Sequence, residues 1–596
     1  MNISRPRSLA LAICLIPLGL LALGLAFIQP AQATNAQHAP DPLNPTGVIT
    51  ATFVGRYTRL IPASEDFFGA AEIVDHDPTT HRLFVVNALS STIDILDGSD
   101  PANITLLDAI DVTPYGHSAN SVAVNNGYVA AAIQADPAQD PGTVAFFDTD
   151  GNFVAAVTVG ALPDMVTFSP DGQKVLVANE GEPDSDYLVD PEGSVSIIDV
   201  AGGIPNVTQN DVTQVTFTAF NGAALDPSVR IFGPNATVAQ DVEPEYIAVS
   251  ADSSTAWVTL QENNAVAVID INAGMVTGIV GLGFKDHALA ENPLDASNED
   301  GPGGEGAINI ANWPVYGMYL PDSIATYEAG GSVYLVTANE GDSRDYDGFS
   351  EEERVKDLTL DPTAFPFSDT LQLDENLGRL KVTNTLGDTD SDGDYDELYA
   401  FGARSFTIWD ANGNLVWDSA DALEQITAQL FPNGFNSDGE NDTFDSRSDD
   451  KGPEPEGLAI GKIYGRTFAF VGLERIGGFF IYDISNPMNP AFVQYVTTRD
   501  FSGDLFAGTS GDISPEGLKF VPAAESPTGK PLLLAAHELS NTTAVFEITA
   551  LAPTDVSLTG LAGDGHGWGS PLGLALLLLV VLAGGLAGWR RLHPAG

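Results

Sequence analysis

Short runs in which apolar and polar residues alternate recur along the chain, separated by turns rich in Gly, Pro, Asp and Asn. In the clearest unit, one strand runs from Pro163 to Phe168, a turn follows, and further strands run from Lys174 to Asn179 and from Ser194 to Asp199. The same order returns between Pro244 and Asp270. Strict alternation between turn residues indicates β-strands. A repeated unit of a few short strands is typical of a β-propeller.

Seven units begin with the same signature, a turn followed by an acid or amide at the start of an alternating strand. The sequence therefore predicts an all-β fold, a β-propeller of about seven blades. The hairpin from Leu398 to Trp417 has no matching start, and it leaves an eighth blade open. A strand from Phe53 to Leu60 precedes the first unit. We expect it to pair as the outer strand of the last blade, because this closes the ring and removes its sheet edges.

Two long segments interrupt the repeat, from Lys285 to Tyr319 and from Asp342 to Asn376. Connections of this length inside a compact domain are usually functional or disordered. If the protein is a binding module, we expect its specificity to lie in these two inserts.

The two ends of the chain predict export and an anchor. Arg5 and Arg7 precede an apolar run and a small-residue cleavage site at Ala33, which indicates a signal peptide over residues 1–33, with an uncleaved anchor as the alternative. Residues 571–591 are apolar up to Arg590 and Arg591, which predicts a transmembrane or sorting tail with the body outside the cell.

We place a linker at 34–52, the propeller at 53–550 and a Gly-rich spacer at 551–570. The predicted location is the cell surface or the extracellular space, with the membrane as a partner through the C-terminal helix. Cleavage of the tail stays open.

Composition narrows the partners and the chemistry. Of the 596 residues, 44% are hydrophobic and 18% are charged, and the formal net charge is −57. Nucleic-acid phosphates and anionic lipids need basic surfaces, so this charge argues against both as partners. It favours divalent cations or an exterior adapted to acid or salt, although a solvated acidic surface also explains most of it. Cys14 is the only cysteine and lies in the signal peptide, so disulfides, a cysteine zinc site and a cysteine nucleophile are excluded from the mature chain.

Several long motifs resemble one known family. They are the segments from Val177 to Val200 (VANEGEPDSDYLVDPEGSVSIIDV), Val336 to Tyr346, Leu386 to Asp410 and Pro453 to Gly461. They resemble the choice-of-anchor I family, a bacterial surface domain similar to the mesenchyme-specific cell surface glycoprotein group. The resemblance spans most of the chain from Phe53 to Ile548 and implies a YVTN-like propeller joined to varying C-terminal anchors. Some members of the family are called alkaline phosphatases, which implies a phosphoesterase as an alternative activity.

One acidic loop has the spacing of a calcium site. Acids stand at alternate positions and Gly393 stands at the sixth, which matches the start of a calcium-binding loop. Tyr399 occupies the place of the bidentate Glu of an EF-hand, so a nearer acid must complete the shell. The predicted ligands of a structural calcium ion are Asp388, Asp390, Asp392, Asp394, Asp396 and Glu397. The alternative is an acidic turn without a fixed metal.

The repeat also predicts two rings of side chains at the mouth of a central channel, because the innermost strand of each blade begins beside that channel. The first ring consists of Glu72, Asn120, Asp164, Glu245, Asp322, Glu456 and Glu516, and the second of Glu180, Glu262, Glu340, Glu474 and Glu538. A carboxylate-lined mouth favours a further divalent cation or a cationic ligand. The alternative is a repeated latch, in which each carboxylate caps backbone N–H groups of the neighbouring blade.

These features favour a surface-anchored, calcium-stabilised binding module whose ligand is undefined. The first alternative is a metal-dependent phosphomonoesterase, which needs basic groups for the phosphate; Arg344, Arg404 and His537 are the candidate catalytic residues. The second alternative is a purely structural envelope protein. An enzyme would bring Arg344 or Arg404 to two or more ring carboxylates across a metal, whereas a binding module can leave these bases dispersed. Whether the protein is an enzyme therefore stays open.

Overall fold

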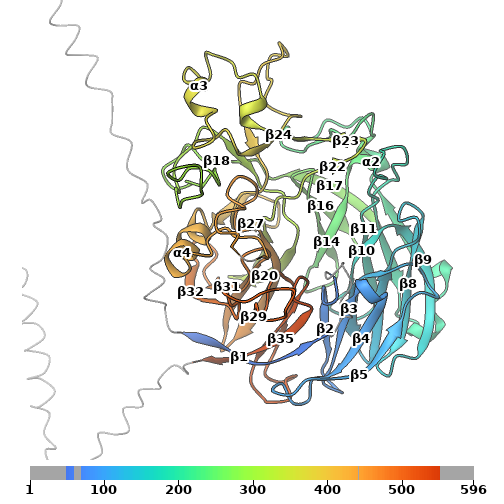
Figure 1. Cartoon of the computed structure of the whole chain (residues 1–596). Coiled ribbons are helices and arrows are strands. Elements are labelled where there is room, and N and C mark those ends of the chain that lie inside the picture. The colour runs from blue at the N-terminus through green and yellow to red at the C-terminus, as the bar shows by residue number, and fades with distance from the viewer. Residues whose placement is uncertain (1–47, 60–68, 441, 551–596) are drawn as a thin grey trace, which may run out of the picture. The chain divides into compact units, whose positions relative to one another are not determined.

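Seven four-stranded antiparallel sheets form the body of the described structure, which is an all-β propeller (Figure 1). The computed structural model describes residues 48–59, 69–440 and 442–550. The predicted signal peptide, spacer and tail, and all but the end of the predicted linker, lie outside these residues. We number the sheets I to VII by the order of their first strands, except that strand β1 belongs to sheet VII.

The strands of the seven sheets have the following bounds. Sheet I contains β2 (Val74–Asp77), β3 (Arg82–Asn87), β4 (Thr92–Asp97) and β5 (Thr105–Asp111), and sheet II contains β6 (Ala119–Asn125), β7 (Tyr128–Ile133), β8 (Pro141–Asp148) and β9 (Phe153–Ala161). Sheet III contains β10 (Pro163–Phe168), β11 (Lys174–Asn179), β12 (Ser194–Asp199) and β13 (Val212–Thr216), and sheet IV contains β14 (Pro244–Val249), β15 (Thr255–Leu260), β16 (Ala265–Asp270) and β17 (Met275–Gly281). Sheet V contains β20 (Ile324–Ala329), β21 (Ser332–Ala338), β27 (Phe406–Asp410) and β28 (Leu415–Asp418), and sheet VI contains β29 (Pro455–Ile463), β30 (Arg466–Leu473), β31 (Phe479–Asp483) and β32 (Ala491–Val496). Sheet VII contains β33 (Pro515–Val521), β34 (Leu532–His537), β35 (Thr542–Ala550) and β1 (Ile49–Thr58).

Sheet VII joins the two ends of the described chain. Strand β1 runs antiparallel to β35, from the pair Ile49–Ala550 to the pair Thr58–Thr542. The predicted closure by an N-terminal strand is therefore confirmed. The strand begins at Ile49, inside the segment that the sequence assigned to the linker, because Ile49 and Ala51 are buried against sheet VI and extend the alternation backwards.

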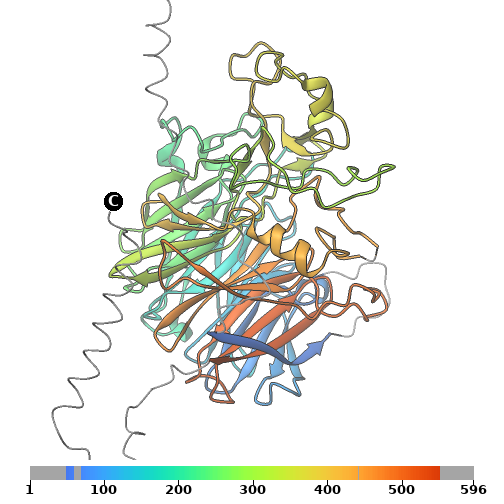
Figure 2. The ribbon, with the colours of Figure 1, turned by 90° about the vertical axis from the view of Figure 1, so that its left-hand side faces the viewer.

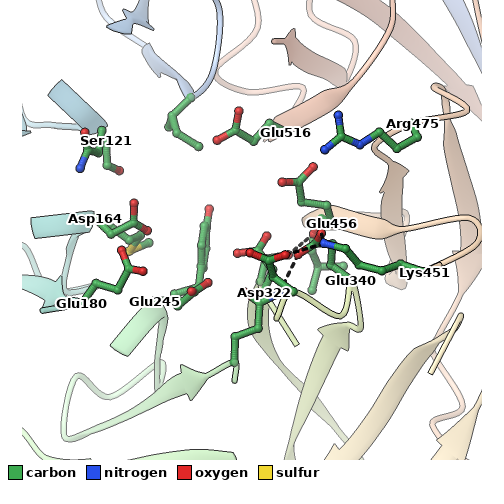
Figure 3. A pocket seen from close by; sticks show the side chains of 18 residues that line it. Ser121, Asp164, Glu180, Glu245, Asp322, Glu340, Lys451, Glu456, Arg475 and Glu516 are labelled. Atoms are coloured by element: carbon green, nitrogen blue, oxygen red, sulfur yellow. Dashed lines mark hydrogen bonds and ion pairs between the residues drawn. The ribbon is translucent and has the colours of Figure 1, made fainter. Parts of the chain in front are cut away.

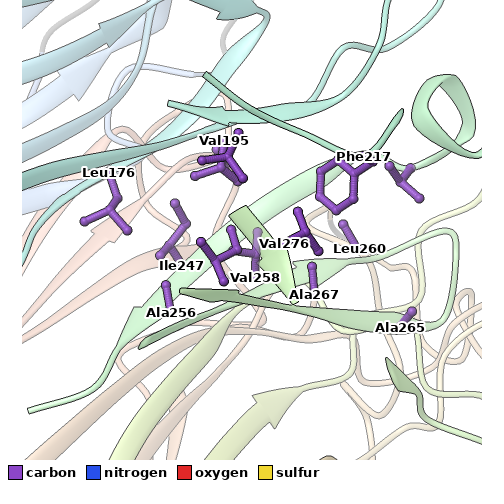
Figure 4. Close-up of a cluster of buried hydrophobic side chains, with 14 of the residues drawn as sticks. Leu176, Val195, Phe217, Ile247, Ala256, Val258, Leu260, Ala265, Ala267 and Val276 are labelled. Atoms are coloured by element: carbon purple, nitrogen blue, oxygen red, sulfur yellow. The ribbon is translucent and has the colours of Figure 1, made fainter. Parts of the chain in front are cut away.

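Neighbouring sheets pack face to face, and each strand serves two interfaces. In β15, Val258 packs with Val195 of sheet III (Figure 4), whereas the adjacent Trp257 packs with Trp409 of sheet V. Both faces of the sheet are thus removed from water. This explains why the inner strands are nearly continuous apolar runs and not strictly alternating ones.

The two inserts build a second sheet over one end of the propeller (Figures 1 and 2). Its five strands lie in the order β18 (Phe284–Asp286), β19 (Tyr316–Met318), β26 (Tyr399–Ala400), β25 (Lys381–Thr383) and β24 (Glu352–Arg354), and β19 and β26 are parallel. A two-stranded sheet of β22 (Asp345–Tyr346) and β23 (Phe349–Ser350) lies beside it. The five-stranded sheet has a hydrophobic core of its own, which includes Leu294, Val355 and Leu398. The α-helices of the described residues are α2 (Val238–Asp241), α3 (Ser368–Leu371) and α4 (Ala422–Leu430).

The hairpin that left an eighth blade open does not form a separate sheet among the described residues. Its first part, β26, joins the insert sheet, while β27 and β28 complete sheet V beside β20 and β21. The hairpin has no start signature of its own because the inner strands of its sheet, β20 and β21, come before the second insert in the sequence. The insert separates strands of one sheet by more than 60 residues, between Ala338 and Phe406.

The predicted membrane partner needs correction. Within the described ranges, no helix has the length and apolar character needed to cross a bilayer. Attachment to a membrane through a C-terminal helix is therefore not supported, and residues 571–591 lie outside the described part of the chain.

Closure of the ring gives a first prediction. Phe546 on β35 is buried and contacts Phe479 and Phe53 at ring-centroid distances of 4.9 and 5.9 Å. We expect Phe546→Ala to lower the free energy of unfolding by about 3 to 5 kcal/mol, because it leaves a cavity where the ring closes. Phe367, which is 78% exposed, offers the matched control. Calorimetry should show a clearly lower Tm for Phe546→Ala than for Phe367→Ala, and equal Tm values would contradict the role of this contact.

Candidate functional site: an acidic cavity enclosed by all seven sheets

A bulge at the start of the innermost strand turns one side chain of most sheets toward the centre. The pairing register shifts between Ala119 and Ser121, and in the same way after Pro163, Pro244, Pro455 and Pro515. In each of these five strands, the first-ring residue lies between the two residues at which the register shifts. A bulge removes its extra residue from the regular ladder and re-aims the side chain. Proline suits the first position because it has no N–H to contribute to the ladder.

These side chains surround one cavity of about 280 Å³ (Figure 3). All seven sheets contribute to it, through strands or the residues that flank them. The first-ring residues that line it are Asn120, Asp164, Glu245, Asp322, Glu456 and Glu516, and the second-ring residues that do so are Glu180 and Glu340. Together with Asp342, eight carboxyl groups face the cavity, against the two basic groups of Lys451 and Arg475.

Four predicted ring residues are not among those that line the cavity. Glu72 is close enough to Glu516 to raise the pKa of that carboxyl, after the larger effect of burial. Glu474 pairs with Arg475 at 2.7 Å. Glu262 is buried with its Oε2 atom unpartnered, and Glu538 acts on the pKa of Glu72.

The sequence did not identify Asp342 and Lys451 as part of the site. Lys451 Nζ lies 2.8 Å from Glu340 and 2.6 Å from Asp342. Asp342 lies two residues beyond the ring position Glu340, and Lys451 lies in the connection between α4 and β29, so neither occupies a position that the repeat predicts. The motif Glu340-Gly341-Asp342 after β21 was the available signal, because it carries a second acid close to a ring position.

Burial and mutual repulsion disfavour ionisation of the ring carboxyls. Burial, followed by the nearby Glu182 carboxyl, raises the pKa of Asp164 to about 7. Burial and Glu538 raise the pKa of Glu72 to about 9. Burial, followed by Glu262 and Glu180, raises the pKa of Glu245 well above its ordinary value, and burial and Glu474 do the same for Glu456. At neutral pH these groups need protons or added positive charge.

Hydroxyl groups, and not the first-ring carboxylates, connect neighbouring sheets at the mouth. In the second ring, Glu340 accepts a hydrogen bond from the Gln261 amide of sheet IV at 2.7 Å. Thr259 donates a hydrogen bond to the carbonyl of Asp322 at 2.8 Å, and Ser323 donates one to the carbonyl of Glu456. Ser121 accepts one from the N–H of Val166 at 3.2 Å. Among the described residues, no backbone N–H donates to a first-ring carboxylate, and Glu456 Oε2 is buried without a partner. The contacts therefore leave these carboxyl groups available to the cavity.

The three candidate catalytic residues are not among those that line the cavity. Arg344 is buried and pairs with Asp241 at 2.6 Å and Glu243 at 3.0 Å. Its short distance from Glu340 in sequence does not bring it to the mouth, because the chain turns into β22 and directs the guanidinium toward α2.

Arg404 and His537 are also held by structural contacts. Arg404 pairs with Glu424 at 2.6 Å and donates to the carbonyls of Ser448 and Asp450. Burial lowers the pKa of His537, whose Nδ1 atom lies 3.3 Å from the carbonyl oxygen of Thr542. None of these side chains meets two ring carboxylates in the arrangement that an enzyme would require.

The acidic loop lies after the second insert, between β25 and β26 of the five-stranded sheet. Carboxylate oxygens of Asp388, Asp390 and Asp392 lie within 4.8 Å of one another, and those of Asp394 and Asp396 form a second group with Asp361. The N–H groups of Asp392 and Gly393 donate to Asp388 at 3.1 Å. Glu397 instead accepts a hydrogen bond from the Tyr399 hydroxyl at 2.5 Å. Asp361 is distant in sequence, and only the bridge between Leu360 and Tyr395 brings it here.

Comparison with known proteins gives one family and two curated relatives. The family model of the choice-of-anchor I domain matches residues 72–487. Gigasin-3a of Magallana gigas is 33% identical over 194 residues, which cover 30% of this chain and 68% of that protein. The mesenchyme-specific cell surface glycoprotein of Strongylocentrotus purpuratus is 28% identical over 321 residues, which cover 46% of this chain and 40% of that protein.

Two solved structures are similar to this chain only at low identity and low TM-score. Hydrazine synthase of Kuenenia stuttgartiensis has a TM-score of 0.43 and 12% identity, covering 83% of this chain and 100% of that chain. The WD40 domain of Toxoplasma gondii coronin has a TM-score of 0.42 and 9% identity, covering 85% and 88%.

The raised pKa of Asp164 gives a prediction with a defined sign. In metal-free protein, stability should fall as pH rises from about 4, the ordinary value, to about 7, because the folded state holds the proton more tightly than the unfolded state. Asp164→Asn should not show this fall in stability, because the asparagine side chain does not ionise. The Tm of the variant minus that of the wild type should therefore increase by several degrees between pH 5 and pH 8 in chelator.

Glu328→Gln is the matched control for this measurement, because Glu328 lies on the innermost strand β20 but is exposed. Its Tm difference from the wild type should stay flat over the same pH range. A flat difference for Asp164→Asn as well would show that the cavity does not oppose ionisation.

Proposed function

The chain belongs to the choice-of-anchor I domain family, and on that premise we propose that it is a cell-surface binding module, a calcium-stabilised propeller of seven blades whose acidic cavity holds a divalent cation or a compact cationic group. The observation that carries the proposal is the excess of carboxyl groups over basic groups around one cavity. Like charges in a poorly solvated space repel strongly, and a bound cation offsets both the repulsion and the cost of burial.

The size of the cavity limits the ligand. At about 30 Å³ per water molecule, a volume of about 280 Å³ holds the equivalent of roughly nine waters. This suits one or two partly hydrated ions, or a single ammonium or guanidinium group. A larger partner would present only such a group to the mouth and would meet the inserts with the rest of its surface.

Phosphomonoester hydrolysis fits the geometry less well. The eight lining carboxyls repel a phosphate, and both lining bases are already paired, Lys451 with Glu340 and Asp342, and Arg475 with Glu474. A phosphoesterase needs unpaired basic groups or metals aimed at the transferred phosphoryl group. We therefore favour binding over catalysis, and a phosphomonoester assay with calcium, zinc or manganese tests this choice directly.

The acidic loop between β25 and β26 supports the calcium part of the proposal. Its two groups of three carboxylates supply oxygen ligands only, which is the donor set that calcium prefers. The proximity of Asp392 raises the pKa of Asp390, so this loop gains from a cation. The geometry favours Asp361 over Glu397 as a ligand.

Cation binding at the cavity is tested by titration calorimetry on the purified protein. We expect Glu245→Gln combined with Glu456→Gln to weaken binding of the cavity cation by at least about 10-fold, since even residues behind the direct ligands change metal affinity by that much. Glu328→Gln should bind as the wild type does. Unchanged affinity in the double variant, or no cation bound near the cavity, would favour a purely structural role.

Calcium at the acidic loop is tested by thermal unfolding. A ligand at about 100 times its Kd stabilises the folded state by about 2.7 kcal/mol. We expect calcium to raise the Tm of the wild type by a few degrees. In Asp390→Asn, most of the part of this rise that comes from the acidic loop should be lost. A Tm for Asp390→Asn that responds to calcium and chelator as the wild type does would exclude the loop as a calcium site.

A further inference from the structure

The lining of the acidic cavity is not purely ionic. Besides the eight carboxyl groups it includes apolar and aromatic side chains that belong to, or directly precede, strands of four different sheets: Ile73, Met165, Tyr246 and Leu458. A hydrated metal ion gains nothing from such walls, whereas an organic cation can place its carbon atoms against them. The lining therefore separates two kinds of cation that charge alone does not.

The spacing of the lining carboxyls also bears on the ligand. Calcium holds its oxygen ligands at about 2.3–2.6 Å, so oxygens on one ion lie within about 5 Å of one another. Across the described parts of the chain, three groups of three acids meet a spacing of 4.8 Å, and none of these groups consists of cavity-lining residues. A single ammonium nitrogen, with hydrogen bonds of about 2.8 Å, needs oxygens equally close together. The lining thus offers no ready shell for one bare ion or one ammonium group.

A guanidinium group suits oxygens that are farther apart. It is planar, and its five N–H donors point outward in different directions, so it can reach carboxyl groups on separate walls. It is also more weakly hydrated than an ammonium group, which lowers the cost of entering a poorly solvated space. Its proton stays in place even beside carboxyls that are difficult to ionise.

Tyr246 supplies an aromatic ring to the same cavity. Its N–H donates to the Thr259 hydroxyl at 2.9 Å, and that hydroxyl lies 3.3 Å from the Tyr246 carbonyl oxygen, so both backbone groups are held by β15. Burial, followed by the nearby Asp322 carboxyl, raises the pKa of the Tyr246 hydroxyl, and Asp164 acts in the same direction. The hydroxyl therefore lies among carboxyls of more than one sheet. Guanidinium groups stack on aromatic faces of this kind.

Three carboxyl groups lie across the cavity from its two bases (Figure 3): Asp164, Glu180 and Glu245. The bases are already occupied on their own side. Lys451 pairs with Glu340 at 2.8 Å and with Asp342 at 2.6 Å, and Arg475 pairs with Glu474 at 2.7 Å. The wall opposite them therefore keeps its negative charge for a ligand.

We propose that the cavity binds the guanidinium group of a ligand, between the carboxyls that face Lys451 and the ring of Tyr246. This inference rests on the proposed function, because it names the class of cation that the same cavity takes. Hydrogen bonds to the carboxyls fix the edges of the group, and the aromatic ring covers its face. The group belongs to an arginine side chain of a partner or to a small free guanidino compound, which share this chemistry.

The experiment compares three cations by titration calorimetry on the purified full chain. Ethylguanidinium and ethylammonium are titrated in chelator, and calcium is titrated without it. We expect ethylguanidinium to bind at least about 10-fold more tightly than ethylammonium. Calcium is titrated into the wild type and into Glu245→Gln, so that only binding lost in the variant is assigned to the cavity. That binding should be weaker than the binding of ethylguanidinium.

Variants of the cavity test the two contacts separately. Glu245→Gln should weaken ethylguanidinium binding at least about 10-fold, because it removes charge-assisted hydrogen bonds. Tyr246→Leu should weaken it at least about 3-fold through loss of the aromatic face, whereas Tyr246→Phe should bind as the wild type does. Glu328→Gln is the matched control, and thermal unfolding checks that each variant is folded. Equal losses in Tyr246→Phe and Tyr246→Leu would overturn the role of the ring.

A capped Gly-Arg-Gly peptide distinguishes the two sources of the group. Binding at least as tight as that of ethylguanidinium indicates an arginine of a partner, and much weaker binding indicates a small free compound. If calcium or ethylammonium binds at the cavity as tightly as ethylguanidinium, the guanidinium inference is wrong but the proposed function stands. If none of the three cations binds there, both are wrong.

Discussion

The structure depends on how a closed ring accommodates buried negative charge. Seven sheets bring the starts of their innermost strands to one place, and most of these starts present a carboxyl group to the same cavity. In an open array the repulsion would relax by separation of the sheets. Here the pairing of β1 with β35 closes the ring, and the apolar faces between neighbouring sheets keep its diameter fixed. The charge must therefore be balanced by protons, by Lys451 and Arg475, or by a bound cation.

The same requirement explains how the inserts are attached to the propeller. Lys451 reaches the cavity from one connection, and Arg344 from another neutralises Asp241 and Glu243 beneath the insert. Arg230 pairs with Glu351 in the same region, and both side chains are almost fully buried. Buried pairs of this kind add little net stability over apolar contacts, but the loss of one partner is costly. The inserts are thus tied to the ring through charge pairs that fix their position more than they increase stability.

The parts of this arrangement that repeat could be predicted from the sequence. Strand alternation and the recurring proline-acid starts are local signals, and closure of the ring then places the residues after Pro163, Pro244 and Pro515 around one centre. The insert sheet could not be predicted in this way. Its strands are two or three residues long, and β19 pairs in parallel with β26, about 80 positions away. Such pairing leaves no periodic pattern.

The basic residues show the same limit. Arg344 follows Glu340 by four positions, which suggested a role at the mouth, yet its direction is set by Asp241 and Glu243, about 100 positions earlier. Arg475, beside Glu474, does reach the cavity wall because it directly follows β30 of the repeat. Residues at repeat positions inherit their direction from the strand, whereas residues in inserts take theirs from whichever buried charge they meet.

The position of Lys451 therefore determines where in the cavity a cation can bind. A cation that enters must share Glu340 and Asp342 with the Lys451 ammonium group, or bind among Asp164, Glu180 and Glu245, which lie across the cavity from Lys451 and Arg475 (Figure 3). Coulomb attraction and the better access of a small ion favour the second position. The side of the cavity away from Lys451 is thus the part with the largest uncompensated charge. A ligand bound there would meet the carboxyls of sheets III and IV, while Lys451 would keep the opposite wall attached to the inserts.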